Sequence, residues 1–450
     1  MEMSKQRIDM VNGPLLKNIF MFAVPIMFTS LLQMLFNAAD TVIVGKFSGE
    51  HALAAVGATS SIIFFLTSLF NGLAVGANVV IAQLFGEQNK KRINEAVHTA
   101  IFIAVTGGVL LTVIAMVFAR KILLLMSTPS EIIDLSHLYL NIYFSGVISL
   151  FVYNFASAIL RSKGDTKRPL YYLFISGLLN VILNLIFVIV FKWSVAGVAL
   201  ATIISETLSA ILVINALIHE KDSTKLILKN IRLNTKIALD IMKVGIPAGI
   251  QSIVFSLSNI VVQSSLNSFD SAIIVAGNSA ALNIENFVYI GMNAFTQATI
   301  TFTSQNIGAK KYKAIKKILW LTFLLTFISG FSVSFIIWIF GRFFLSLYTN
   351  DVAVIDAGMI RLTYVTLLLV LNGLLDVFVC SMRGMGNSIV PTVTMIIGIC
   401  GLRMSWLWFI FPLYPTLQII YVCFPISWIF TTIIQYFLWI KTHRTFLENS

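Results

Sequence analysis

The stretch PLYYLFISGLLNVILNLIFVIVF, residues 169–191, runs for 23 positions without a charged residue. About 20 residues of α-helix cross the roughly 30 Å hydrocarbon core of a membrane, so this stretch predicts a membrane-spanning helix. Eleven further apolar stretches predict spans of the same kind. Their approximate ranges are 15–44, 53–84, 95–119, 132–159, 195–217, 237–266, 272–303, 318–340, 354–381, 389–411 and 416–440. The sequence therefore predicts an all-α integral membrane protein with twelve transmembrane helices.

The composition agrees with a chain whose solvent is lipid. Of the 450 residues 58% are hydrophobic and only 11% are charged, a balance that a water-soluble core does not require. The cysteines Cys380, Cys400 and Cys423 fall in predicted helices without metal-ligand spacing, and we expect them to be small apolar side chains. The first apolar run is too long for a signal peptide, so we expect it to be retained.

The net charge of +12 raises the question of nucleic-acid binding, but the position of the basic residues gives another explanation. Counting from a cytoplasmic N-terminus, 24 of the 31 Lys and Arg residues fall in inner segments. The outer segments hold only Lys46, Arg120, Lys121, Lys192, Arg342 and Arg361. This asymmetry is the positive-inside rule, and it predicts a plasma-membrane protein with both termini in the cytoplasm and no nucleic-acid partner.

The chain repeats itself at an offset of 222 residues without a gap. The aligned pairs include Pro25 with Pro247, Gln83 with Gln305, Gly86 with Gly308, Arg161 with Arg383, Gly164 with Gly386 and Pro169 with Pro391. Because the repeat holds six helices, its two copies are parallel and related by a pseudo-two-fold axis along the membrane normal. We expect an N-lobe of residues 1–217, a cytoplasmic linker of 218–236 and a C-lobe of 237–450.

Polar residues inside one predicted lobe suggest a cation site. Asn180 and Asn184 are four residues apart, so both amides lie on one helix face. Thr202 in the next helix adds a hydroxyl, and Asp40 in the first helix adds a carboxylate. Oxygen ligands of this sort suit hard cations such as Na⁺, although two asparagines can also join helices by hydrogen bonds alone.

Other buried polar residues have less certain partners. Glu206 and Glu285 are candidates for substrate binding or proton relay, because an ionisable residue inside the membrane is a functional-site hypothesis by default. Asp376 and Arg403 have opposite charges on adjacent segments, which favours a structural ion pair over a substrate site. Asn154 occupies the position of Asp376 in the other repeat, so the two halves differ chemically.

Two prolines lie inside predicted spans. Pro25 and its repeat partner Pro247 each remove a backbone hydrogen bond and permit a kink in the first and seventh helices. Either a hinge or a static kink agrees with this pattern.

Several local patterns together resemble the multidrug and toxic compound extrusion (MATE) family, over nearly the whole chain. They are NAADTVIVG at 37–45, LAAVG at 53–57, AQLFG at 82–86 and RSKGDTKRP at 161–169, followed by Asn180, Asn184 and Gly197. The resemblance implies two six-helix lobes around a central cavity. It also implies an N-lobe cation site at Asp40, Asn180, Asn184 and Thr202. The acids that one branch of the family has in helices seven and ten are replaced here by Phe255 and Asn372.

The resemblance implies a secondary transporter that exports organic, often cationic, molecules in exchange for Na⁺ or H⁺. Alternating exposure of a site between two rocking lobes is the expected mechanism. The alternative is a flippase for lipid-linked saccharide, which would require several basic residues deep in the membrane, where only Arg403 is expected. The predicted helices contain no nucleophile or phosphate-binding motif, so we do not expect an enzyme. We expect a monomer without a cofactor other than the coupling ion.

Overall fold

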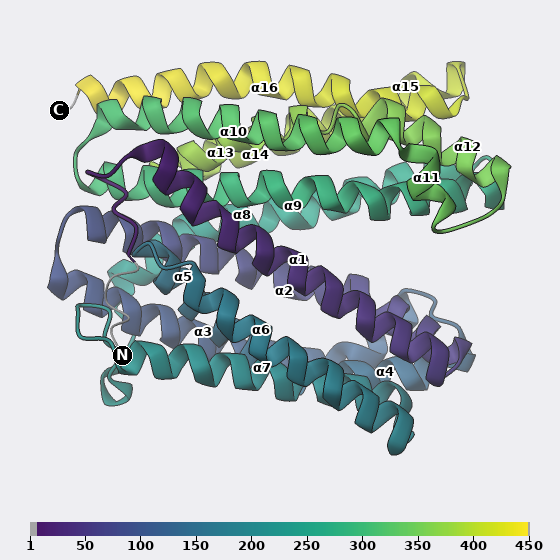
Figure 1. The fold of residues 1–450 in the computed structure, drawn as a ribbon, viewed down its shortest axis with the longest axis horizontal. Helices are drawn as coiled ribbons and strands as arrows, with labels where there is room; N and C mark the ends of the chain where they lie inside the picture. The colour runs from purple at the N-terminus through teal and green to yellow at the C-terminus, as the bar shows by residue number, and fades with distance from the viewer. Residues whose placement is uncertain (1–6, 449–450) are drawn as a thin grey trace. The chain divides into compact units, whose positions relative to one another are not determined.

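The computed structural model describes residues 7–448, and Lys5 of the predicted inner charges lies outside this range (Figure 1). Within it the chain is helical and contains no strand. The α-helices are α1 (Leu15–Phe47), α2 (Glu50–Gly86), α3 (Lys90–Leu125), α4 (Ser130–Ser145), α5 (Val147–Ser162), α6 (Lys167–Asn184), α7 (Ser194–Ile218), α8 (Thr235–Asn267), α9 (Ala272–Gly308), α10 (Tyr312–Ile339), α11 (Gly341–Ser346), α12 (Val352–Arg361), α13 (Val370–Gly384), α14 (Ile389–Met395), α15 (Leu402–Phe409) and α16 (Leu417–Glu448). Three π-helical turns are η1 (Leu185–Val190), η3 (Leu362–Thr366) and η4 (Ile396–Gly401), and two 3₁₀ turns are η2 (Leu228–Asn230) and η5 (Phe411–Leu413).

The number of spans agrees with the sequence. Eleven helices among the described residues are long and apolar enough to cross a membrane, and α4 with α5 makes a twelfth span that is bent by 46°. The break falls at Gly146, where a Cβ would meet the side chain of Ile203 in α7 at 2.5 Å. Close packing against α7 therefore accompanies the bend, and the prediction of twelve transmembrane helices is confirmed.

Two compact units make up the chain, and their boundary runs through two helices. Unit 1 consists of Met1–Ile8 and Phe28–Gly249, and unit 2 consists of Asp9–Met27 and Ile250–Ser450. The division cuts α1 and α8, so each unit contains part of both helices. The lobes expected from the sequence follow the repeat instead, and their boundaries stay a prediction.

Unit 1 packs its helices through small residues. In α2, a Cβ on Gly72 would collide with the backbone nitrogen of Gly249, and a Cβ on Gly76 would collide with the carbonyl of Ile241. Gly245 and Gly249 of α8 have the same four-residue spacing as the two α2 glycines. Pairs of small residues four apart let helix backbones approach closely in lipid, where packing replaces the hydrophobic drive for association.

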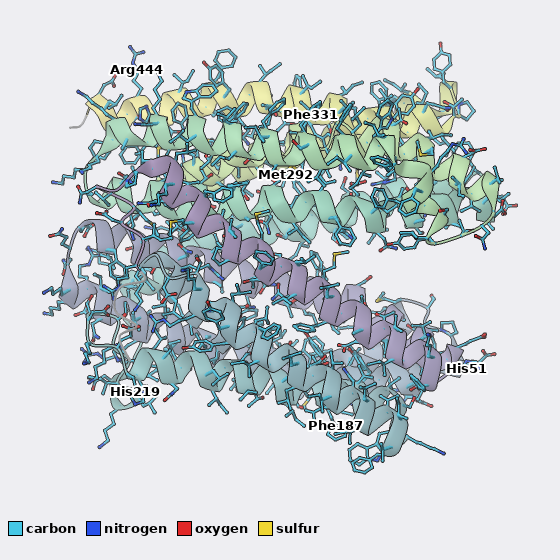
Figure 2. All side chains as sticks on the ribbon, viewed as in Figure 1. His51, Phe187, His219, Met292, Phe331 and Arg444 are labelled. Carbon is cyan, nitrogen blue, oxygen red and sulfur yellow. The ribbon has the colours of Figure 1, made fainter. Side chains whose placement is uncertain are left out.

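Unit 2 is organised around α9, which contacts α10, α12 and α13, while α13 also contacts α16. The rings of Phe327, Phe331 and Phe335 stack along α10 with centroid separations of 5.5 and 5.7 Å, and Figure 2 labels Phe331. Each ring is more than two fifths exposed. In a membrane protein such a face is the surface that contacts acyl chains.

The repeat is visible in the backbone. Helix α9 begins and ends 222 residues after α2. Gly164 and Gly386, also 222 apart, both have a positive φ, 93° and 88° respectively. In both turns the glycine N–H donates to the carbonyl three residues earlier, on Arg161 and Arg383. A left-handed residue closing a helix in this way favours glycine, which explains why the sequence repeats it.

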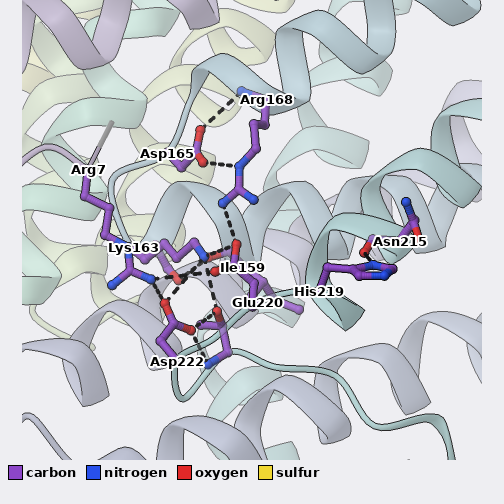
Figure 3. A network of polar contacts seen from close by, with 11 residues as sticks. Arg7, Ile159, Lys163, Asp165, Arg168, Asn215, His219, Glu220 and Asp222 are labelled. Atoms are coloured by element: carbon purple, nitrogen blue, oxygen red, sulfur yellow. Dashed lines mark hydrogen bonds and ion pairs between the residues drawn. The ribbon is translucent and has the colours of Figure 1, made fainter. Parts of the chain in front are cut away.

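A polar network in unit 1 joins the segment before α1, the α5–α6 turn and the segment after α7 (Figure 3). The Nζ atom of Lys163 lies 2.6 Å from Glu220 Oε1 and 3.7 Å from Asp222 Oδ2. Arg168 Nη2 donates to Glu220 Oε1 at 2.5 Å, and Arg7 pairs with Asp222. The Lys163 side chain is 1% exposed and that of Glu220 is 11% exposed. The network therefore holds the start of the linker against the α5–α6 turn.

Burial and ion pairing shift the pKa values of Lys163 and Glu220 by different balances. Burial lowers the pKa of the Lys163 ammonium to about 8, although hydrogen bonding to Glu220 opposes it. At Glu220 burial raises the pKa, but the hydrogen bond and charge of Lys163 together with those of Arg168 bring it below the ordinary value of 4.5. The more exposed carboxylate is thus stabilised in its charged form by two cations.

Replacing Glu220 with glutamine is expected to weaken the dependence of stability on acid. The pKa of Glu220 is lower in the folded protein, so the unfolded chain binds more protons and wild-type stability falls as pH drops below about 4.5. Glu220→Gln lacks this contribution, and its melting temperature in detergent should be lower than that of the wild type at neutral pH but should fall less on acidification. Glu87→Gln, which changes an exposed pair with Arg92 at 3.8 Å, is the control. Equal pH profiles for Glu220→Gln and the wild type would contradict the expectation.

Candidate functional site

Three of the four residues expected to form a cation site come together in unit 1. Asn184, at the end of α6, donates through Nδ2 to Asp40 Oδ1 of α1 at 2.5 Å. The same nitrogen lies 3.2 Å from Asn180 Oδ1, one turn earlier in α6. Asn180 is 4% exposed and Asn184 is fully buried, whereas Asp40 is partly exposed. The carboxylate thus faces a buried amide pair.

One oxygen of this cluster has no hydrogen-bond partner. Asn184 Oδ1 is buried and unpaired in the structure. An unsatisfied buried carbonyl costs free energy, so this oxygen near the Asp40 carboxylate is suited to accept an electropositive ligand. Carboxylate and amide oxygens are ligands that a hard cation such as Na⁺ accepts. The arrangement fits such a cation, and the Asp40 carboxylate alone could instead bind a proton.

The backbone around the two asparagines brings α1 and α6 close together. Gly177 lies one turn before Asn180, and a Cβ at this position would overlap the ring of Phe36, one turn before Asp40. Directly after Asn184 the helix widens into the π-helical turn η1. Single π turns inside α-helices occur frequently at functional sites, because they redirect the side chains beside them.

Thr202, the fourth expected member, lies on α7 and is partly buried. Its hydroxyl donates to the carbonyl of Val198 at 3.0 Å, within its own helix. Among the described residues no hydrogen bond connects Thr202 to Asp40, Asn180 or Asn184. The structure therefore joins three of the four residues directly, and a role for Thr202 stays a prediction.

Glu206, one turn beyond Thr202 in α7, belongs to the same neighbourhood. Its carboxyl group interacts electrostatically with Asp40. The phenol groups of Tyr139 and Tyr143 in α4 also interact electrostatically with Glu206, and Tyr139 does so with Asp40 as well. Two acids and two phenols of unit 1 therefore influence one another electrostatically. The tyrosines were not singled out in the sequence because aromatic residues are common throughout the chain.

Asn154 has a separate environment. Its Nδ2 atom donates to Asn71 Oδ1 of α2 at 3.1 Å. Among the described residues no hydrogen bond links it to the cluster around Asp40. Its repeat counterpart Asp376 has different partners, which agrees with the expected chemical difference between the halves.

In unit 2 the predicted candidate Glu285 forms a buried ion pair. Its Oε2 atom lies 3.0 Å from Arg361 Nη2 and 3.1 Å from Arg361 Nε. Arg361 also donates to Asn278 Oδ1 at 3.0 Å, and its guanidinium lies over the rings of Tyr421 and Phe424. Arg361 is 3% exposed, and its place on the outer face of the membrane stays a prediction.

The expected pair of Asp376 with Arg403 is also wrong. Arg403 lies over the Phe424 ring, 4.1 Å from its centroid, and donates through Nε to Ser427 Oγ at 3.2 Å. Asp376 instead shares a hydrogen bond with Tyr289 and faces the charge of Arg383. Within residues 7–448 no ion pair joins the two. Arg403 is therefore accommodated by aromatic faces, which attract a cation without an opposite charge.

Comparison with known proteins gives the family. The family model MatE matches residues 25–186 and again 247–409. The chain belongs to the MatE family. The two matches correspond to the two copies of the repeat, and together they cover most of the chain. The candidate residues Asp40, Asn180 and Asn184 lie within the first match.

Relatives and solved structures agree with membership in the MatE family. The chain is 28% identical over 448 residues to "Probable multidrug resistance protein YoeA" of Bacillus subtilis, covering 95% of both chains. It is 24% identical over 394 residues to "Probable multidrug resistance protein NorM" of Thermotoga maritima, covering 86% of this chain and 84% of the other. A solved outward-facing multidrug resistance MATE family transporter of the MOP superfamily has a TM-score of 0.92 at 20% identity, with full coverage of both chains. The protein is thus a bacterial MATE transporter.

Proposed function

We propose that this MATE transporter is an antiporter that exports organic cations in exchange for Na⁺ or H⁺. The observation that carries the proposal is the cluster of Asp40, Asn180 and Asn184, with the buried and unpaired Asn184 Oδ1 beside a carboxylate. Such a cluster would hold a coupling ion, with Thr202 as a further oxygen donor. Glu206 would relay protons to Asp40 or assist ion binding.

Coupling requires that ion and substrate favour different states of the transporter. A ligand shifts a conformational equilibrium only by its differential affinity for the two states. Asp40 bonds to a neighbouring helix, so occupation of its carboxylate by an ion changes the contact between α1 and α6. An ion that strengthens one arrangement of these helices would oppose the arrangement that binds substrate.

The position of the prolines supports a hinge role for Pro25 and Pro247. Both prolines lie inside continuous helices, α1 and α8. The boundary between the compact units falls after Met27 in α1 and after Gly249 in α8, two residues beyond each proline. Proline interrupts the helical hydrogen-bond ladder, so bending there requires less energy than elsewhere in the helix. We propose that these two positions bend during transport.

The test is export of ethidium from proteoliposomes of uniform protein orientation under an imposed Na⁺ or H⁺ gradient. We expect export to depend on one of the two gradients, which identifies the coupling ion. Gradient-independent export would contradict antiport, and no export under either gradient would contradict the organic-cation substrate. Lipid-linked saccharide would then be the next substrate to examine. Both termini should be accessible from the cytoplasmic side, as labelling of single introduced cysteines would determine.

A further inference from the structure

A polar cavity outside the Asp40 cluster lies where the linker between the repeats contacts α3. The cavity has a volume of about 230 Å³. Its walls are Asn94, Glu95, His98 and Thr99 of α3 together with Lys229, Asn230, Arg232 and Asn234 of the linker. All of these residues belong to unit 1. Nothing in the proposed transport cycle uses the cavity, so its chemistry requires a separate explanation.

The α3 wall is a fixed frame whose polar groups already have partners. Asn94 Nδ2 donates to the carbonyl oxygens of Ser223 and Lys225. The ring of His98 bonds to Asn94 O at 2.7 Å and accepts the Ile227 N–H at 3.1 Å. These bonds hold the linker backbone against the helix.

The far side of the frame is closed by Asn234. Its backbone N–H donates to Thr99 Oγ1 at 3.2 Å, and its Nδ2 donates to Glu95 Oε2 at 3.1 Å. The Glu95 carboxylate is therefore hydrogen-bonded to the wall. These contacts shape the cavity before any ligand arrives, which lowers the entropic cost of binding.

The cationic groups of the cavity differ from Glu95, whose carboxylate is hydrogen-bonded to Asn234. Lys229 and Arg232 both line it, and among residues 7–448 neither forms an ion pair. With Glu95 as the single acid, the lining has an excess of positive charge. Two cations beside amide donors form a site for a phosphate group, because Arg and Lys donate to phosphate oxygens through charge-assisted hydrogen bonds.

The surroundings of the two cations indicate where the phosphate comes from. Three large apolar side chains flank them in the linker, with exposures of 42% for Ile227, 59% for Leu228 and 47% for Leu233. The linker connects the ends of the membrane helices α7 and α8, so it lies at the membrane surface. Apolar side chains beside basic ones on such a segment suit the acyl and headgroup regions of an anionic lipid.

We propose that this linker cavity binds the phosphate group of an anionic membrane phospholipid. Lys229 and Arg232 contact the phosphate, while Ile227, Leu228 and Leu233 contact the acyl chains. The cavity volume is several times the roughly 30 Å³ of a water molecule, which leaves room for a phosphate and part of its glycerol. The bound lipid holds the linker on α3.

Native mass spectrometry of the full chain in detergent tests the proposal, with phosphatidylglycerol and phosphatidylcholine of identical acyl chains as probes. We expect one retained phosphatidylglycerol on the wild type. The double variant Lys229→Gln/Arg232→Gln should bind it about 30-fold more weakly, from about 1 kcal/mol for each basic group. The matched control Lys225→Gln/Lys236→Gln removes the same charge from linker positions outside the cavity lining, and it should lose less than about fivefold.

Three results would overturn the proposal. Equal losses in the two double variants would show that linker charge attracts lipid without a site. Equal retention of both lipids by the wild type would exclude recognition of an anionic headgroup. Displacement of the lipid by millimolar inorganic phosphate, with stabilisation of the wild type alone, would assign the cavity to a soluble phosphate compound. Matching melting temperatures of the two double variants in detergent would establish that both are folded.

Discussion

Replacing Asp40 with asparagine is expected to reduce gradient-driven export to the rate of protein-free liposomes. The substitution keeps the size of the side chain and leaves an oxygen that can accept the hydrogen bond from Asn184 Nδ2. It removes the negative charge, so the site can no longer hold a proton and binds Na⁺ weakly. Ion occupancy then has no differential effect on the two states, and coupling is lost. Ethidium export under imposed gradients measures the effect.

Asp134→Asn is the matched control for this experiment. Asp134 is an acid of the same unit, its side chain is 78% exposed, and it pairs with Arg120 at 3.2 Å. The control should export at the wild-type rate. Binding of ethidium to Asp40→Asn, measured by fluorescence polarisation, separates loss of coupling from loss of the folded transporter. Wild-type export by Asp40→Asn would remove Asp40 from the coupling mechanism.

Replacing Arg361 with methionine is expected to destabilise the protein by about 3–5 kcal/mol, because breaking a buried ion pair leaves an uncompensated charge. Glu285 would lose its partner at 3.0 Å, and Asn278 Oδ1 would lose a donor. The contacts of the guanidinium with Tyr421 and Phe424 would also disappear. Unfolding of purified protein in mixed micelles of increasing denaturing-detergent fraction measures the change in free energy.

A second substitution distinguishes the charge from the packing. Glu285→Gln combined with Arg361→Met removes both charges, and the double variant should be more stable than Arg361→Met alone. Arg342→Met is the control, because the Arg342–Asp356 pair is exposed on both sides and should contribute no more than about 1 kcal/mol. A loss for Arg361→Met no larger than that for Arg342→Met would show that the buried pair contributes little.

The spans and the three-residue cluster could be predicted because each depends on local properties of the sequence. Hydropathy identifies a span wherever apolar residues run long enough, and a four-residue spacing places Asn180 and Asn184 on one helix face without knowledge of the fold. The contact of that face with Asp40 required only that α1 and α6 be neighbours. The spans are confirmed, whereas of the four residues expected to form the site the structure joins three, and their role as a cation site stays a prediction.

The partners of Arg403 and Arg361 could not be predicted in the same way. Sequence gives the helix that carries a side chain, but the rotation of that helix against its neighbours depends on packing of the whole unit. Arg403 consequently meets Phe424 and Ser427 instead of Asp376. The bend between α4 and α5 lies at Gly146, where α7 packs closely. This position has no proline from which the bend could be predicted.

The division of α1 and α8 between the two units has a consequence for synthesis of the chain. Unit 1 includes residues up to Gly249, and unit 2 includes Asp9–Met27 from the beginning of the chain. We therefore expect unit 1 to gain its last contacts only after the start of the second repeat has left the ribosome, and the first part of α1 to gain its contacts in unit 2 later still. A gene divided within the linker should give two fragments that are each incomplete when expressed alone and that assemble when expressed together.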